Sequence, residues 1–158
     1  MPAIINKLIR SFKGSSTRTF FLYPFLIVGG ALLWNEGQLP FEPVFIPVAA
    51  WGYLQYRLCG KYRIRHGGGG PGMDTPPERL VTTGPFAYSR NPMYIGHIIF
   101  LLGMALTFHS LLAVILAAGT AIFFHTRIAR DERRLVTQFG ESYIAYSQKV
   151  KRWLPGLF

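Results

Sequence analysis

The chain alternates between long apolar stretches and short polar breaks. Four apolar stretches of about 15 to 17 residues cover 19–35, 44–59, 93–108 and 111–125. As α-helices they would be about 23 to 26 Å long, slightly shorter than the roughly 30 Å hydrocarbon core of a bilayer. Interfacial side chains, packing within a bundle or a thin local membrane would compensate for the difference. The pattern therefore predicts four transmembrane helices arranged as two hairpins.

The polarity pattern changes after the fourth apolar stretch. Arg127, Asp131 and Gln138 follow at helical spacing, and Gly140 is placed to end that helix. Residues 141–150 have a second, shorter amphipathic pattern. We therefore predict an all-α, polytopic membrane protein whose C-terminal region forms short cytoplasmic helices.

Three segments follow from this organisation. Residues 1–60 would hold an N-terminal basic segment and the first hairpin, and residues 61–79 a glycine-rich basic cytoplasmic loop. Residues 80–158 would hold the second hairpin and the C-terminal helices. Within residues 1–18 basic and apolar positions alternate, which is compatible with a helix lying on the membrane surface or with a frayed tail.

The charge distribution supports this topology. Half of the residues are hydrophobic and only 15% are charged, against roughly 25% in soluble domains. The net charge of +10 would suggest nucleic-acid binding in a soluble chain. With four alternating spans, however, all 17 lysines and arginines lie on one side, and only Glu36 and Glu42 lie on the other. The positive-inside rule then places both termini in the cytoplasm, and we assign the chain to a prokaryotic inner (plasma) membrane with no nucleic-acid partner.

Two other features carry no cofactor chemistry. The glycine run at 67–70 is not followed by the Gly-Lys-Ser/Thr sequence of a phosphate-binding loop, so we interpret it as a flexible connection. The single cysteine, Cys59, has no partner for an internal disulfide or a metal site. We expect it to be a small buried residue, and we predict no metal site.

The candidate site is the polar stretch 80–96, which leads directly into the third apolar stretch. Gly84-Pro85 marks a turn, and Pro92 disfavours helical geometry at Asn91 while fitting the first turn of a new helix. The free N–H groups and the dipole at a helix start favour an anionic group. This stretch therefore predicts a site for a charged, water-soluble ligand at the membrane surface.

Several motifs in this half of the chain occur in a fixed order. They are Leu80-Val81-Thr82-Thr83-Gly84-Pro85-Phe86, then Arg90-Asn91-Pro92-Met93-Tyr94-Ile95-Gly96, a helical hairpin, Asp131-Glu132, Phe139-Gly140, Tyr143, Tyr146 and Val150-Lys151-Arg152-Trp153-Leu154-Pro155. In this order, residues 78–158 resemble the isoprenylcysteine carboxyl methyltransferase and phospholipid methyltransferase superfamily. Residues 1–77 match that superfamily only as membrane spans.

The resemblance implies an integral-membrane methyltransferase that binds S-adenosylmethionine in a cytoplasmic pocket and methylates a lipophilic or lipid acceptor. It implies that Arg127 is catalytic and lies near the acceptor. We also name His97 as a substrate-binding candidate, with a helix–helix hydrogen bond as the alternative. The implied cofactor-binding residues are Glu78, Arg79, Leu80, Val81, Phe86, Asn91, Pro92, Met93, Tyr94, Asp131 and Glu132.

Three positions depart from the pattern of that superfamily. Asn91 stands where many members have His, Phe86 where many have Tyr, and Asp131 where Glu is usual. Asn keeps hydrogen-bonding capacity but cannot titrate, Phe lacks the hydroxyl, and Asp has one methylene less reach. We expect cofactor binding to survive these changes, with an altered affinity.

The required chemistry leaves some alternatives open. Methyl transfer from a sulfonium is an in-line displacement, for which a protein supplies proximity, alignment and exclusion of water. A carboxylate or thiolate acceptor needs no base, whereas an amine does, so the sequence favours the former. Asp131 and Glu132 could instead form surface salt bridges, and Tyr94 could be an interfacial anchor. The alternative function is a non-enzymatic membrane scaffold or small-ligand-binding protein; a channel is disfavoured because no span carries an acidic residue.

Overall fold

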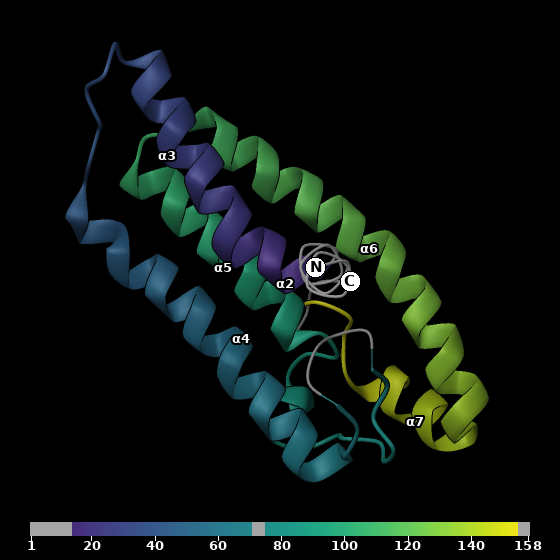
Figure 1. Cartoon of the computed structure of the whole chain (residues 1–158). Coiled ribbons are helices and arrows are strands. Elements are labelled where there is room, and N and C mark those ends of the chain that lie inside the picture. Colours follow the sequence, from purple (N-terminus) through teal and green to yellow (C-terminus); the bar gives the residue numbers. More distant parts are fainter. Residues whose placement is uncertain (1–13, 71–74, 155–158) are drawn as a thin grey trace, which may run out of the picture.

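The structure, a computed structural model, describes residues 14–70 and 75–154. The surface helix considered for the N-terminal segment therefore lies largely outside the described residues. Within them the chain is all-α, as predicted, and its helices are arranged as Figure 1 shows. They are α2 (Ser15–Thr17), the π-helical turn η1 (Arg18–Leu22), α3 (Tyr23–Trp34), the short 3-10 helix η2 (Pro43–Phe45), α4 (Ile46–Gly67), the 3-10 turn η3 (Gly84–Ala87), α5 (Pro92–Thr107), α6 (Leu111–Phe139) and α7 (Glu141–Lys149).

Four long helical segments correspond to the four apolar stretches. The continuous segment α2–η1–α3, α4, α5 and α6 run alongside one another, and α5 packs against both α4 and α6 (Figure 1). Among the described residues two segments, Ser15–Trp34 and Leu111–Phe139, are long and apolar enough to cross a membrane. Helix α5 is apolar but shorter, and α4 carries four basic residues in its second half.

Small residues bring α4 and α5 close together. A Cβ atom added at Gly52 would lie 2.7 Å from the Gly96 carbonyl oxygen, and one at Gly103 would lie 2.3 Å from the Ala49 amide nitrogen. Neither contact could be relieved by a side-chain rotation, because the neighbouring atoms belong to the backbone. Close helix packing by small residues is a common basis of association within membranes. Gly96 and Gly103, seven residues apart on α5, therefore both allow the α4 backbone to approach closely.

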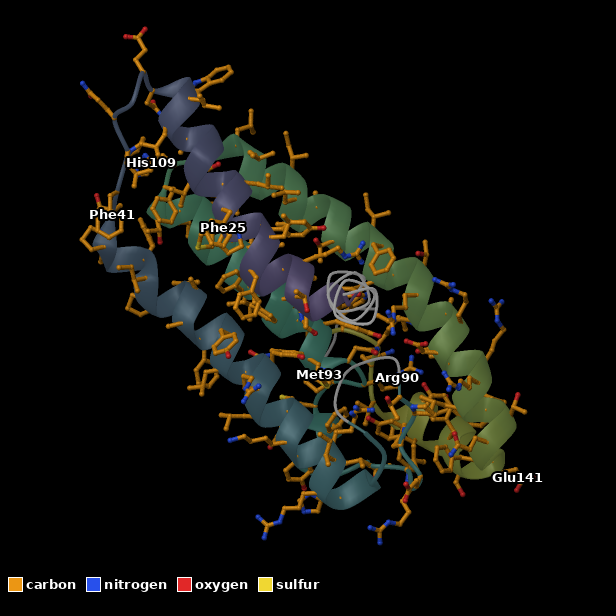
Figure 2. The ribbon with its side chains drawn as sticks, in the orientation of Figure 1. Phe25, Phe41, Arg90, Met93, His109 and Glu141 are labelled. Carbon is orange, nitrogen blue, oxygen red and sulfur yellow. The ribbon has the colours of Figure 1, made fainter. Side chains whose placement is uncertain are left out.

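Both hairpins turn at the end of the bundle away from its polar end, through residues 35–42 in the first hairpin and through the shorter connection 108–110 in the second. Ser110 begins α6 and accepts a hydrogen bond from the Ala113 amide, while His109 adopts a positive φ of 46° in the preceding turn. Figure 2 shows His109 and Phe41 at one end of the bundle and Met93 and Arg90 towards the other. The predicted short turn between the third and fourth stretches is therefore confirmed.

Two helices extend further than the hydrophobic pattern predicted. Helix α4 continues to Gly67, so the glycine-rich connection begins at Gly68 and not at residue 61. The reason is that the last turns of α4 support the following loop: the Gly67 carbonyl accepts hydrogen bonds from the amides of Glu78 and Arg79, each at 2.8 Å. Helix α6 is one continuous helix of 29 residues that includes both the apolar stretch and the polar continuation, and it ends at Gly140 (φ 54°) as predicted.

Candidate functional site

A cavity of about 130 Å³ lies at the polar end of the bundle. The loop between α4 and α5 forms one wall, and the first turn of α5, the polar half of α6 and helix α7 form the others. The lining combines apolar and aromatic side chains with carboxylates and guanidinium groups. The lining residues are Arg63, Thr75, Pro76, Pro77, Leu80, Val81, Phe86, Arg90, Asn91, Pro92, Met93, Tyr94, Asp131, Glu132, Arg134, Leu135, Tyr143 and Tyr146.

Most of the predicted cofactor-binding residues meet in this cavity. Glu78 and Arg79 are exposed and do not line it, and neither do Arg127 and His97. The predicted residues that do line it are Leu80, Val81, Phe86, Asn91, Pro92, Met93, Tyr94, Asp131 and Glu132. Two sequence segments about 40 residues apart are thus brought together because the α5–α6 hairpin returns the chain to the same end of the bundle.

Tyr94 and Asp131 form the central polar contact of the cavity. The Tyr94 hydroxyl donates a hydrogen bond of 2.8 Å to Oδ2 of Asp131, and Nε of Arg127 donates to the same oxygen at 3.4 Å. The Tyr94 ring is only 6% exposed and stacks on Phe124 with ring centroids 4.3 Å apart. A ring held in this way cannot serve as an interfacial anchor, so Tyr94 orients the Asp131 carboxylate.

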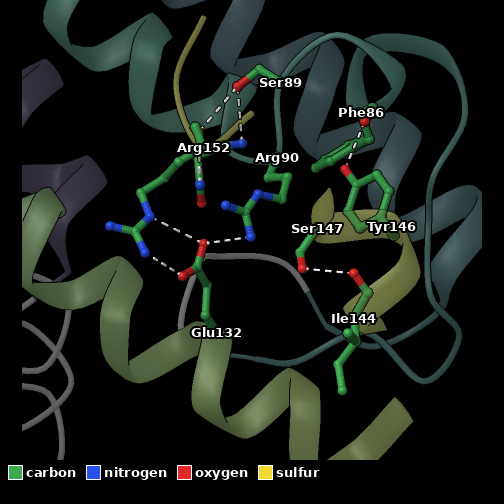
Figure 3. A network of polar contacts seen from close by, with 9 residues as sticks. Phe86, Ser89, Arg90, Glu132, Ile144, Tyr146, Ser147 and Arg152 are labelled. Atoms are coloured by element: carbon green, nitrogen blue, oxygen red, sulfur yellow. Dashed lines mark hydrogen bonds and ion pairs between the residues drawn. The ribbon is translucent and has the colours of Figure 1, made fainter. Parts of the chain in front are cut away.

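Glu132 has a different environment from its neighbour. Both of its oxygens accept hydrogen bonds from Arg152, at 3.2 and 2.6 Å, and Arg90 lies 2.9 Å from Oε1 (Figure 3). The bonds to Glu132 raise the pKa of the Arg152 guanidinium. Burial, with the nearby Glu132 charge, also raises the pKa of Tyr143, which keeps that phenol neutral. Because two arginines already bind it, Glu132 fastens the C-terminal segment to α6.

The start of α5 is attached to the same C-terminal segment. The side-chain amide of Asn91 donates to the Arg152 carbonyl oxygen at 3.0 Å, and its backbone amide donates to Oγ of Ser89 at 3.1 Å. One residue earlier, the Arg90 amide donates to the Lys151 carbonyl at 3.0 Å. Asn91 therefore lines the cavity with its side-chain nitrogen, Nδ2, already hydrogen-bonded to the C-terminal segment. It shapes the wall, and its side-chain oxygen, Oδ1, is the atom that it offers to a ligand.

Sequence reasoning missed Arg63, which comes from α4. This side chain is buried, and it donates to the Thr75 carbonyl at 2.6 Å and to the Gly70 carbonyl at 3.1 Å. It therefore attaches both Gly70 and Thr75 to α4 and forms part of the cavity wall. In the sequence Arg63 is one of several basic residues in this helix, and nothing in its spacing distinguishes it from the exposed ones.

Tyr146 belongs to the ordered motifs, but its place in the sequence indicates no specific role. Its hydroxyl donates a 2.6 Å hydrogen bond to the Phe86 carbonyl oxygen, which links α7 to η3 (Figure 3). Burial raises the pKa of this phenol, so it remains a donor at physiological pH. The contact holds the Phe86 backbone, and with it the apolar side of the cavity.

His97 lies outside the cavity, one turn further along α5. It is fully buried between the rings of Phe20, Tyr56 and Phe124. Its Nδ1 atom lies 2.9 Å from the Met93 carbonyl oxygen, and no described residue bonds to Nε2. His97 therefore contacts the backbone of Met93 but does not line the cavity that the other site residues share.

Comparisons with known proteins agree with the motifs. Residues 70–142 match the family described as phospholipid methyltransferase. Protein-S-isoprenylcysteine O-methyltransferase of Schizosaccharomyces pombe is 38% identical over 77 residues, which cover 48% of this chain and 33% of the relative. Methanethiol S-methyltransferase 1 of Bradyrhizobium diazoefficiens is 34% identical over 85 residues, which cover 53% of this chain and 29% of the relative.

The fold and the cavity define an all-α protein with membrane-length apolar helices and a polar pocket at one end. The match of residues 70–142 to the phospholipid methyltransferase family agrees with the superfamily that the motifs indicated. The chain spans about a third of the length of these relatives. The matched region contains the α4–α5 loop, α5 and α6, and it leaves α4 and Arg63 outside.

Proposed function

We propose that the protein is an integral-membrane methyltransferase that transfers a methyl group from S-adenosylmethionine to a lipophilic acceptor. The observation that carries this proposal is the convergence of nine predicted cofactor-binding residues on one cavity, with Asp131 oriented by Tyr94 beside Arg127. The cofactor supplies an already activated methyl group. The protein then contributes binding, alignment and exclusion of water.

The lining chemistry fits the three recognition groups of this cofactor. Leu80, Val81 and Phe86 offer an apolar surface for the adenine ring. Arg63 and Arg134 carry the positive charge that its carboxylate requires, and the α5 helix start adds a favourable dipole. The cofactor ammonium group requires an acid, and the two candidates are adjacent in sequence.

Asp131 is the better candidate for the ammonium group. Each Glu132 oxygen already accepts a hydrogen bond from an arginine, whereas only Oδ2 of Asp131 accepts one from a described residue. A further cation at Glu132 would compete with Arg90 and Arg152. We therefore assign Asp131 to cofactor binding and Glu132 to holding the site together.

Arg127 is placed to receive an anionic acceptor. It is one helical turn before Asp131 on α6, towards the apolar half of that helix. A carboxylate or thiolate head group entering from the bilayer would find this guanidinium beside the cofactor ammonium site. An amine acceptor would need a base, and the two acids in the described lining are already hydrogen-bonded. The names of the relatives include both carboxyl- and thiol-directed enzymes, which agrees with this preference.

The basic and polar residues at the cavity end of the bundle also support a membrane topology. We infer four membrane-spanning segments, namely α2–η1–α3, the first part of α4, α5 and the first part of α6. The cavity, the basic end of α4 and the polar half of α6 would then face the cytoplasm of a prokaryotic cell, together with both chain termini. We keep the division of the chain into segments 1–60, 61–79 and 80–158, although helix α4 continues into the segment 61–79.

The function can be tested by two measurements on the purified protein. We expect the detergent-solubilised protein to bind S-adenosylmethionine in a calorimetric titration. We also expect it to transfer labelled methyl groups to at least one anionic lipid or prenyl thioether in a panel that includes phospholipid amines. Binding without transfer would favour the alternative, a small-ligand-binding membrane protein, and transfer only to amines would contradict the acceptor class proposed here.

A further inference from the structure

A second hollow, which we call the α4 groove, lies apart from the cofactor cavity. Its volume is about 930 Å³, and it shares no lining residue with that cavity. Helix α4 forms one wall, while the η3 region, α5 and the C-terminal segment form the other. The described residues that line it are Trp51, Gln55, Leu58, Cys59, Lys61, Tyr62, Arg65, His66, Pro85, Tyr88, Ser89, Ile95, Ile99 and Leu154.

The α4 groove changes from apolar to basic along its length. Trp51 and Leu58 lie towards the apolar end of α4 and are about half exposed, and Ile99 faces them from α5. Lys61 and Arg65 lie on the last turns of α4. Fourteen residues separate Trp51 from Arg65, which corresponds to about 21 Å along a helix, more than one leaflet of a hydrocarbon core of about 30 Å. An acyl chain and its head group would both fit within this distance.

Among the described residues, the basic end of the α4 groove has no counter-charge. Both Lys61 and Arg65 are exposed, and no salt bridge within the described residues involves either of them. The described lining of the groove contains no aspartate or glutamate. In the cofactor cavity, by contrast, Arg90 and Arg152 are paired with Glu132. The groove is therefore complementary to an external anion attached to an apolar chain.

We propose that the α4 groove binds one anionic membrane phospholipid, with its phosphate at Lys61 and Arg65 and an acyl chain along Leu58, Ile99 and Trp51. Juxtamembrane basic residues attract anionic lipids, and the half-exposed side chains of Trp51 and Leu58 offer apolar surface to an acyl chain. The inference rests on the membrane placement proposed above and does not depend on methyl transfer. The methyl acceptor is a poorer occupant, because neither Arg127 nor Asp131 reaches the groove.

Tryptophan fluorescence provides a direct test, because Trp51 lines the groove and Trp34, 88% exposed on α3, does not. Two single-tryptophan proteins would be made, one retaining Trp51 and one retaining Trp34, with phenylalanine at the other tryptophan positions. Each would be reconstituted in nanodiscs of phosphatidylcholine that contain a small fraction of brominated phosphatidylglycerol or of brominated phosphatidylcholine. Bromine quenches a tryptophan only at short range, so quenching reports the local lipid composition.

We expect brominated phosphatidylglycerol to be preferred roughly thirtyfold at Trp51 and not at Trp34, from the combined attraction of an anionic lipid to two basic residues. Lys61→Gln/Arg65→Gln should abolish the preference, and each single variant should reduce it. The matched control is Arg130→Gln/Arg133→Gln, which removes the same charge from exposed positions of α6 outside the groove and should leave the preference intact.

Four results would overturn the proposal. Equal quenching of Trp51 by the two lipids would indicate unselective annular lipid, and an equal loss in the control variant would indicate general surface attraction. A Trp51 shielded from both lipids while Trp34 is quenched would indicate that a protein surface, such as a second copy, covers the groove. If neither tryptophan were quenched, the membrane placement itself would be wrong, and the proposed methyltransferase topology would fail with it.

Discussion

The hydroxyl of Tyr94 donates a 2.8 Å hydrogen bond to Oδ2 of Asp131 and thereby connects the first turn of α5 to the polar half of α6. The ring of Tyr94 is buried against Phe124, so the position of the hydroxyl is fixed by packing. An acid oriented from a rigid position loses little freedom when a ligand binds. This contact therefore links the helix packing of the bundle to the ligand-binding geometry of the cavity.

Removing only that hydroxyl should weaken cofactor binding. We expect Tyr94→Phe to raise the dissociation constant of S-adenosylmethionine roughly five- to tenfold, the net contribution of one ordinary intramolecular hydrogen bond, because the hydroxyl acts on the cofactor only through Asp131. The ring and its stacking on Phe124 remain, so the thermal unfolding temperature should change little. Tyr88→Phe is the control, since Tyr88 is exposed and lies outside the cavity. An unchanged affinity in Tyr94→Phe would show that Asp131 needs no orientation.

Glu132 should prove more important for stability than for ligand recognition. Glu132→Gln would leave Arg90 and Arg152 facing a neutral amide in a half-buried site, which should cost about 1–3 kcal/mol of unfolding free energy. The measurement is thermal or denaturant unfolding in detergent, followed by a cofactor titration below the transition. A variant of normal stability with strongly reduced cofactor affinity would reverse the roles assigned to Asp131 and Glu132.

The planar guanidinium group of Arg63 should be required for full cofactor affinity. Lysine can donate to one of the two carbonyls, at Gly70 or Thr75, but cannot reproduce the two-pronged contact of a guanidinium. We expect Arg63→Lys and Arg63→Gln both to lower cofactor affinity, with the larger loss in Arg63→Gln. Arg57→Gln, at an exposed position of the same helix, is the matched control. Equal affinity in all three variants would show that the contacts of Arg63 with Gly70 and Thr75 do not shape the cavity.

The topology can be tested by labelling single cysteines introduced after Cys59→Ala. Gln38, in the connection after α3, and Arg65, near the end of α4, are both exposed. The proposed arrangement places them on opposite sides of the membrane, so an impermeant maleimide should label Gln38→Cys from outside intact cells and Arg65→Cys only after permeabilisation. Labelling of both positions from the outside would contradict the four-span arrangement.

The sequence predicted the features that depend on neighbouring residues better than those that depend on contacts between distant parts of the chain. The hydrophobic pattern predicted the helices, the His109 turn and the end of α6 at Gly140, because these depend on local backbone preferences and burial. The motifs identified Tyr94 and Asp131 as site residues. Neither pattern could show that Arg152 would donate hydrogen bonds to Glu132. That contact joins residues 20 positions apart and depends on how the C-terminal segment packs on α6.

Arg63 and His97 also show that long-range packing cannot be predicted from sequence spacing. Arg63 lines the cavity although it was not predicted, and His97 was predicted but does not line it. Arg63 appears in the sequence as one of several basic residues of a helix end, and only its contacts with the Gly70 and Thr75 carbonyls distinguish it from the others. His97 appears as a functional residue because it follows the motif by one turn. The helix rotation instead directs its ring between the aromatic rings of neighbouring helices.

The division of roles between Arg127 and Asp131 predicts two different defects. Arg127→Ala should leave cofactor affinity within about twofold of the parent, because a partly exposed ion pair contributes little. Its turnover should fall steeply through poor acceptor handling, and Arg127→Lys should restore it only in part. Parallel affinity and turnover assays on the three proteins test this assignment. A loss of cofactor binding in Arg127→Ala would place this arginine in the cofactor site.

The most direct test of the account is a calorimetric titration of S-adenosylmethionine into the purified parent protein and into Asp131→Asn. The substitution keeps the size of the side chain and removes the charge that we assign to the cofactor ammonium group. The account predicts saturable binding by the parent and an affinity at least about tenfold lower in Asp131→Asn, from the loss of one charge-assisted contact. No binding by the parent, or equal binding by the two proteins, would contradict it.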